Sequence, residues 1–322
     1  MIRQSAICIF LAFVLAILSP GYLWSDDGKR PQVGKCELPN RVPSLVVETP
    51  STLPDTTSPQ LMILPGTVRP VGDFRDIVLA FIQSAPAKPI VLYVHGRGDE
   101  PSKSLKDGIL QSVADEYKAN QILFTWASSK GAFPESEARD AGPSLGNVFN
   151  QLKDIRSSEK SKGLKVTLLT HSMGSIVLEG FLKDYTGDLP AGLFDSVVIS
   201  SSASTVDNHA AWVEKINFSP NVLITYGHED PLLTGAGIGI GTARLGKHGT
   251  RQHGDKERVA VNAVYADFSQ AVGSDHRYFV SNGGQACVYY FFNESLNGRR
   301  PDFSNQKFAT EVTPKKDYLI NK

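Results

Sequence analysis

The chain has 322 residues, in which 33 lysines and arginines balance 33 aspartates and glutamates. This zero formal charge argues against a protein that binds nucleic acid through a basic surface. Hydrophobic residues make up 41% of the chain and charged residues 20%, which excludes wholesale disorder, and three cysteines are too few for a cysteine-rich scaffold or a multi-thiolate zinc site.

An apolar segment opens the chain and has the form of a secretory signal. A short basic start, Met1-Ile2-Arg3, precedes an uncharged run from Ala6 to Leu18, and Pro20-Gly21 ends that run. We expect a signal peptide over residues 1–25 and export of the protein, to the periplasm or into the medium. The alternative is an uncleaved membrane anchor, but the run is shorter than the roughly 20 apolar residues that a spanning helix needs.

Residues 26–72 have the composition of an extended arm. Eight prolines fall within residues 31–70, and proline suits neither a helix interior nor a central strand. From Phe74 onward, apolar residues recur at helical spacing. We therefore expect a Pro-rich arm over 26–72 and one folded domain over 73–322.

Two cysteines, Cys36 and Cys287, follow the predicted signal. In an oxidising compartment a disulfide between them can persist. Their spacing in the sequence gives no distance in space, so two free buried thiols are an equal alternative.

Strands and helices are expected to alternate along the domain. Continuous apolar runs predict strands at 89–94, 122–126, 165–169, 194–200, 221–226 and, last in the chain, 258–268. Helical spacing predicts helices at 74–82, 102–117, 145–155, 175–183 and 209–216. This alternation is typical of the α/β class, with a mostly parallel sheet that is covered by helices on both faces.

Two connections are longer than usual, at 127–143 and 228–257, and we expect both to be irregular. Each follows the carboxyl end of a strand, which is where open α/β sheets bind ligands. Glycines 237, 239 and 241 in the second connection do not have the spacing of a dinucleotide-binding loop.

The sharpest local signal is a serine between a strand and a helix, in Thr170-His-Ser-Met-Gly174. In a nucleophile elbow the serine lies on a tight turn that requires small neighbours, and its hydroxyl projects above the sheet. The amide of Met173 is then at a helix N-terminus and is the first expected donor to an oxyanion. The alternative is an ordinary turn in which Ser172 caps the helix.

A second strand ends in Val94-His-Gly-Arg97. The loop after this strand supplies the other oxyanion donor in proteins with such an elbow, and glycine lets the backbone approach the substrate. We expect the donor to be the Arg97 amide. His95 ends the strand and is expected to be structural.

A serine nucleophile needs an acid and a base, which follow the elbow in the order acid, then histidine. Of seven histidines, only His276 follows the last predicted strand, so it is the expected base. Asp230 comes just after the strand at 221–226 and is the expected acid. Glu229 and Asp207 are the alternative acids, and a simple Asp-Pro turn is the structural explanation of the same residues.

These motifs resemble those of the α/β-hydrolase superfamily. Within it, residues 89–280 are similar to a bacterial α/β-hydrolase family whose substrate is unassigned. The similarity lies in Leu123-Phe-Thr-Trp126, Ala127-Ser-Ser129, Arg139-Asp140, His171-Ser-Met-Gly174, Arg244-Leu-Gly246 and His276-Arg-Tyr-Phe279. Ala127 replaces that family's proline and Thr170 the superfamily's first elbow glycine. The resemblance implies the α/β-hydrolase fold and serine hydrolase chemistry.

The residues together predict an exported serine hydrolase that cleaves an ester, as carboxylesterases and lipases do. Ser172 is the expected nucleophile, His276 the general base and Asp230 the acid that orients it. We expect a small-molecule or lipid ester as substrate, no nucleic acid partner, and no metal or organic cofactor. The alternatives are an acyltransferase with the same triad and a non-catalytic binding protein of the same fold.

Overall fold

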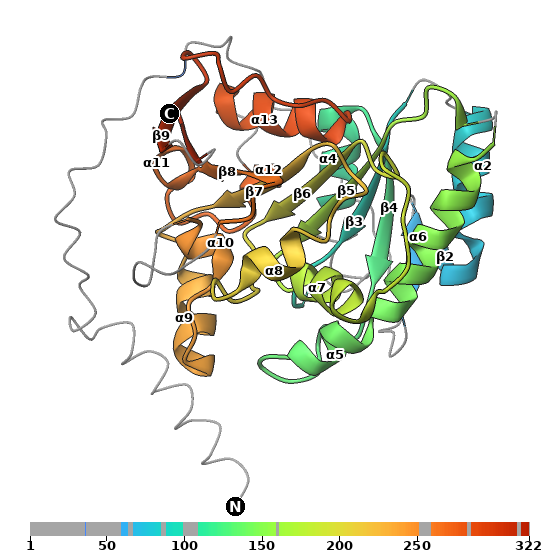
Figure 1. The fold of residues 1–322 in the computed structure, drawn as a ribbon, viewed down its shortest axis with the longest axis horizontal. Coiled ribbons are helices and arrows are strands. Elements are labelled where there is room, and N and C mark those ends of the chain that lie inside the picture. The colour runs from blue at the N-terminus through green and yellow to red at the C-terminus, as the bar shows by residue number, and fades with distance from the viewer. Residues whose placement is uncertain are drawn as a thin grey trace, which may run out of the picture. The chain divides into compact units, whose positions relative to one another are not determined.

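In the computed structural model, one ten-stranded sheet runs through the described part of the chain (Figure 1). The structure describes residues 36, 59–63, 67–84, 88–98, 109–158, 161–250, 259–281, 285–313 and 317–321. Its strands are β1 (Gln60–Ile63), β2 (Thr67–Pro70), β3 (Ile90–Val94), β4 (Asn120–Thr125), β5 (Val166–His171), β6 (Ser196–Ser200), β7 (Val222–Tyr226), β8 (Ala263–Asp267), β9 (Ala309–Thr313) and β10 (Asp317–Ile320).

The helices fall mostly between the strands, as expected for this class. They are α2 (Phe74–Ser84), α4 (Ile109–Tyr117), α5 (Glu135–Asp140), α6 (Gly142–Arg156), α7 (Gly174–Asp184), α8 (His209–Val213), α9 (Pro231–Ile240), α10 (Leu245–His248), α11 (Ser269–Val272), α12 (Tyr278–Ser281) and α13 (Ala286–Leu296). Among the helices described, none is long and apolar enough to cross a membrane.

The sheet is mostly parallel, which confirms the predicted fold class. The strand order is β2-β1-β4-β3-β5-β6-β7-β8-β10-β9. All pairs from β4 to β10 are parallel, whereas β1, β2 and β9 pair antiparallel at the two edges. The carboxyl ends of the parallel strands therefore meet at one edge of the sheet, where the predicted site residues follow them.

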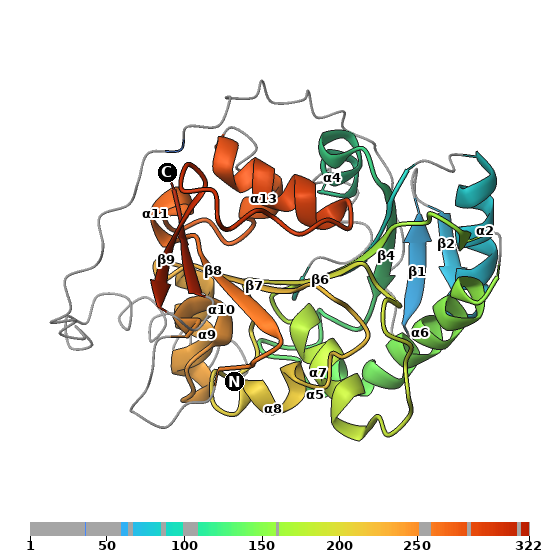
Figure 2. The ribbon, with the colours of Figure 1, turned by 45° about the horizontal axis from the view of Figure 1, so that its top comes forward.

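Helices cover both faces of the sheet, and each face has its own apolar core. Successive side chains of a strand point to opposite faces. Ile90 and Leu92 of β3 accordingly pack in the core under α2, α6, α7 and α8, whereas Val91 and Tyr93 pack in the core under α4, α12 and α13. Figure 2 shows α4 and α13 on one side of the sheet and α6, α7 and α8 on the other. Burial on both faces explains why the strands are continuously apolar.

The sheet starts earlier than the sequence indicates. Residues 60–63 and 67–70, expected in the Pro-rich arm, form β1 and β2, and Leu61 and Met62 are fully buried. Proline is tolerated here because β2 is an edge strand and Pro70 is its last residue. Apart from Cys36, residues 26–58 of the arm and the predicted signal peptide lie outside the described residues.

The Gly-rich connection is partly helical rather than irregular. Asp230 begins α9 as its N-cap, because its Oδ1 accepts hydrogen bonds from the amides of Leu232 (2.9 Å) and Leu233 (3.1 Å). Pro231 occupies the first helical position, and Gly241 ends the helix with a φ of 73°. The connection at 127–143 likewise contains α5 and the start of α6.

The prediction that 258–268 is the last strand is wrong. Two short strands, β9 and β10, follow it, and β10 pairs parallel with β8. Both are short and β9 is an edge strand, so neither has the long apolar run that predicts a central strand. His276 still lies in the connection that directly follows β8.

Cys36 and Cys287 form a disulfide, which decides between the two alternatives left by the sequence. Their Cα atoms are 5.9 Å apart, and 251 residues separate them in the chain. Cys287 is buried in α13 within the core under that helix, and Cys36 packs against the same core. The bond therefore ties Cys36 to α13.

Reduction of this disulfide is expected to destabilise the folded protein by about 2–5 kcal/mol, because the bond closes a long loop and restricts the unfolded chain. Thermal melting with and without reductant measures the effect. The variant Cys287→Ser is expected to melt at the temperature of the reduced protein and to be insensitive to reductant. A wild-type melting temperature that reductant does not change would contradict the role given to this bond.

Candidate active site

Ser172 lies on a sharp turn between β5 and α7. Its φ is 52°, in the left-handed region that residues with side chains rarely adopt. Backbone bonds hold this conformation: the Ser172 amide donates to the carbonyl of Ser200 (3.0 Å), and its own carbonyl accepts from the amide of Ala203 (3.1 Å) and the hydroxyl of Ser175 (2.7 Å). A strained serine held this firmly at a strand end is a candidate nucleophile.

Two glycines let the backbone pack closely around this turn. A Cβ atom on Gly174 would lie 2.2 Å from the carbonyl oxygen of Val94 in β3, so a side chain here would push α7 off the sheet. A Cβ atom on Gly96 would lie 2.8 Å from the Cβ of Ser172. The loop after β3 is therefore in direct contact with the elbow serine.

The two expected oxyanion donors lie on segments that adjoin Ser172. Met173 precedes the first residue of α7, and no described backbone carbonyl accepts a hydrogen bond from its amide. Arg97 follows Gly96, and its exposed guanidinium donates to the carbonyl of Ala132 (2.7 Å). Because Arg97 follows Gly96, its backbone amide lies on the loop that contacts Ser172.

His95 has a structural environment, as the sequence indicates. It is fully buried, and its ring stacks on Trp126 with centroids 5.8 Å apart. The indole of Trp126 donates to the His95 carbonyl (2.9 Å). These contacts fix the end of β3 and the start of the loop that reaches Ser172.

Asp230 and His276, which lie 46 residues apart in the chain, are in contact. Nδ1 of His276 is 2.5 Å from Oδ2 of Asp230, and both residues are buried. Because a carboxylate only accepts hydrogen bonds, this contact places the ring proton on Nδ1 and leaves Nε2 as the basic nitrogen. The other carboxylate oxygen caps α9, so the start of that helix fixes the orientation of the acid.

The backbone of His276 is bound to the residues around the elbow. Its carbonyl accepts from Nε2 of His171 (3.0 Å) and from the hydroxyl of Ser201 (3.1 Å). The rings of His171 and His276 have centroids 4.7 Å apart, and His171 is the residue before Ser172. The structure thus brings Asp230, His276 and the elbow to one edge of the sheet.

The alternative acids are placed differently. Glu229 and Asp207 are both exposed, whereas Asp230 is 2% exposed. The carboxylate that contacts the His276 ring in the described structure is that of Asp230.

Three groups of contacts at this edge could not be found from the sequence. The first is a buried hydroxyl network in which Ser202 donates to Ser175 (2.7 Å) and Ser204 lies 3.2 Å from Ser175. These hydrogen bonds connect the loop after β6 to Ser175, whose hydroxyl donates to the Ser172 carbonyl. A run of serines after a strand is typical of an ordinary turn, so the sequence carries no signal for it.

The second group joins the loop of Asp230 to the loop of His276. Nε2 of His228, in the loop of Asp230, lies 3.4 Å from the Asp267 carboxylate. This carboxylate also accepts hydrogen bonds from the amide and the hydroxyl of Ser269. The Ser269 hydroxyl in turn accepts a hydrogen bond from the His228 amide (2.9 Å). Burial raises the pKa of Asp267, but the His228 ring and the Ser269 donors outweigh burial, so its pKa lies below the usual value.

The third is the buried guanidinium of Arg244. It bonds to Glu135 of α5 (2.9 Å) and to the carbonyl of Ala203 (2.7 Å), next to the residues that hold Ser172. The arginine stands in a motif that carries the family resemblance, but nothing in the sequence indicates its partner.

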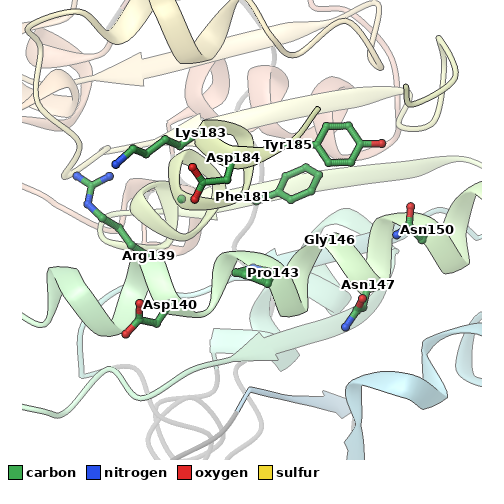
Figure 3. A pocket seen from close by; sticks show the side chains of 11 residues that line it. Arg139, Asp140, Pro143, Gly146, Asn147, Asn150, Phe181, Lys183, Asp184 and Tyr185 are labelled. Atoms are coloured by element: carbon green, nitrogen blue, oxygen red, sulfur yellow. The ribbon is translucent and has the colours of Figure 1, made fainter. Parts of the chain in front are cut away.

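A separate pocket of about 570 Å³ lies between α6 and α7 (Figure 3). Side chains of both charges line it together with two amides and two aromatic rings: Arg139, Asp140, Asn147, Asn150, Phe181, Lys183, Asp184 and Tyr185. None of the predicted catalytic residues is among its lining residues. This pocket is therefore distinct from the site at Ser172.

Similar solved structures include several esterases. An esterase from Pyrobaculum calidifontis is 16% identical, with 65% of this chain and 76% of that chain covered and a TM-score of 0.37. Carboxyl esterase 2 from the fungus Tuber melanosporum is 15% identical, with 66% and 80% covered and a TM-score of 0.37. Similarity at this level assigns no activity.

No curated protein matches the chain in sequence. A family model described as "Alpha/beta hydrolase of unknown function (DUF900)" matches residues 72–276. This stretch is more than half of the chain, and it begins before β3 and ends at His276. The chain therefore belongs to this family of alpha/beta hydrolases.

Proposed function

We propose that the protein is a serine hydrolase that cleaves carboxylic esters through Ser172, His276 and Asp230. The contact between His276 and Asp230 carries the proposal, because it leaves a basic Nε2 on a loop that is bonded to the residue preceding Ser172. The strained conformation of Ser172 adds support, since strain of this kind costs about 1–3 kcal/mol and persists where the surrounding structure enforces it.

The reaction would proceed through an acyl-enzyme. The Ser172 hydroxyl attacks the ester carbonyl while Nε2 of His276 takes its proton, and Asp230 stabilises the imidazolium that forms. The amides of Met173 and Arg97 hold the oxyanion. His276 then protonates the departing alcohol. In the second half of the reaction His276 takes a proton from a water molecule, which attacks the acyl-enzyme, and passes that proton to the Ser172 oxygen as the acid leaves.

We also propose that the protein acts outside the cytoplasm, after removal of the N-terminal signal sequence. The disulfide between Cys36 and Cys287 supports this, because disulfides persist in oxidising compartments and are rare in the cytosol.

Replacement of the nucleophile tests the mechanism. Ser172→Ala is expected to lower the rate of hydrolysis of a chromogenic acetate ester on the order of 10⁶-fold, with little change in melting temperature. His276→Ala is expected to be comparably inactive. His248→Ala, which removes a histidine from α10, is the control and keeps wild-type activity. Substantial activity in folded Ser172→Ala protein would refute the mechanism.

The acid can be tested without disturbing α9. Asparagine is as good an N-cap as aspartate, so Asp230→Asn keeps the helix start while it removes the charge that orients His276. Activity is expected to fall by about 10⁴-fold, because the acid sets the tautomer of the base. Glu229→Gln is the matched control beside it and is expected to stay near wild type. The reverse ranking of kcat values for these two variants would show that Glu229 is the acid.

A further inference from the structure

An uncharged stretch of surface starts directly at the proposed acid. Residues 231–243 contain no charged side chain. Within them, α9 exposes two large aliphatic side chains, Leu232 at 60% and Ile238 at 57%. Leu232 is two residues from the proposed acid, so its exposed side chain lies beside the reaction site.

One face of α9 is entirely apolar. Leu232, Gly235, Ala236 and Gly239 recur at i, i+3, i+4 and i+7, and therefore lie on a single face of the helix. The opposite side of the helix is attached to the protein, since Leu233 is buried and Lys247 donates to the hydroxyl of Thr234. Ile238 lies about 120° away from Leu232 around the helix, off this face.

An aromatic ring closes the far end of the apolar face. A Cβ atom on Gly239 would lie 2.9 Å from the ring of Phe133, so the ring packs directly on the glycine. From Leu232 to Gly239 the helix rises about 10 Å. We call Leu232, Gly235, Ala236, Gly239 and Phe133 the apolar strip.

Both ends of the apolar strip are tied to the proposed catalytic residues. Its near end follows Asp230, which contacts His276. At its far end, Phe133 follows Ala132 in the chain, and the Ala132 carbonyl accepts a hydrogen bond from the Arg97 guanidinium. Arg97 is next to Gly96, which contacts Ser172. Figure 1 shows α9 and α5 projecting beyond the sheet at the end toward which β4 points. The strip therefore borders the edge of the sheet where the ester would react.

We propose that the apolar strip binds the acyl chain of the substrate, so that the enzyme prefers esters of extended, uncharged acids over acetate. This inference rests on the proposed esterase function and adds its substrate class. Gly235 carries no side chain that would keep a chain away from the helix, and Leu232 and Phe133 supply the apolar contact.

The test compares octanoate and acetate esters of the same chromogenic alcohol, each kept below the concentration at which it aggregates. The measured quantity is the ratio of kcat/KM for octanoate to that for acetate. Wild type is expected to favour octanoate, and Leu232→Ser is expected to lower the ratio about fivefold, since it removes an aliphatic contact made only with the longer chain. Leu232→Met keeps an apolar side chain and is expected to restore it.

Ile238→Ser is the matched control, because it removes a similarly exposed aliphatic residue from another face of the same helix. It is expected to leave the ratio unchanged. An unchanged ratio in Leu232→Ser, or an equal fall in both serine variants, would overturn the acyl-chain proposal while hydrolysis of acetate still supports the esterase. A wild-type protein that cleaves neither ester would overturn both.

Discussion

The close approach of α7 to β3 is the constraint on which the site depends. Because Gly174 packs against the Val94 carbonyl, the chain must turn sharply between β5 and α7, and Ser172 takes the strained conformation at that turn. The strain costs about 1–3 kcal/mol. Hydrogen bonds to the Ser172 amide and carbonyl, each worth about 1 kcal/mol, are sufficient to offset it.

The same edge of the sheet brings the other groups to the serine through backbone contacts. The loop after β3 contacts Ser172 through Gly96. In the loop after β8, the His276 carbonyl accepts hydrogen bonds from His171, which precedes Ser172, and from Ser201. Asp230 has two roles, since one carboxylate oxygen begins α9 and the other holds His276. The acid is therefore oriented before any substrate binds, and the apolar helix that follows it is fixed relative to the base.

The arrangement of the site could be predicted from the sequence because chain order and sheet geometry leave few choices. The carboxyl ends of parallel strands share one edge, so a serine after β5, an acid after β7 and a histidine after β8 were expected to lie together, and the structure places Asp230 against His276. Glycine after β3 was expected to let the backbone approach the substrate, and in the structure Gly96 packs against Ser172 itself.

Other parts of the structure could not be predicted, because there the local composition and the packing disagree. Glycines at 235, 237 and 239 indicated a loop, but an N-cap and a proline at the first position start a helix there. Prolines suggested an arm over residues that form β1 and β2, and Pro70, at the end of the edge strand β2, costs no sheet hydrogen bond. The partners of Arg244 and the serines after β6 depend on tertiary contacts, which no local pattern encodes.

The proposed role of Ser172 as the reactive nucleophile can be tested with a covalent probe of active serines. Wild-type protein treated with a fluorophosphonate is analysed by intact mass and by fragmentation of the tryptic peptide that spans residues 166–183, which contains both Ser172 and Ser175. If Ser172 is the nucleophile, a single adduct is expected, on Ser172. No adduct, or an adduct on Ser175 or on any other serine, would contradict this role.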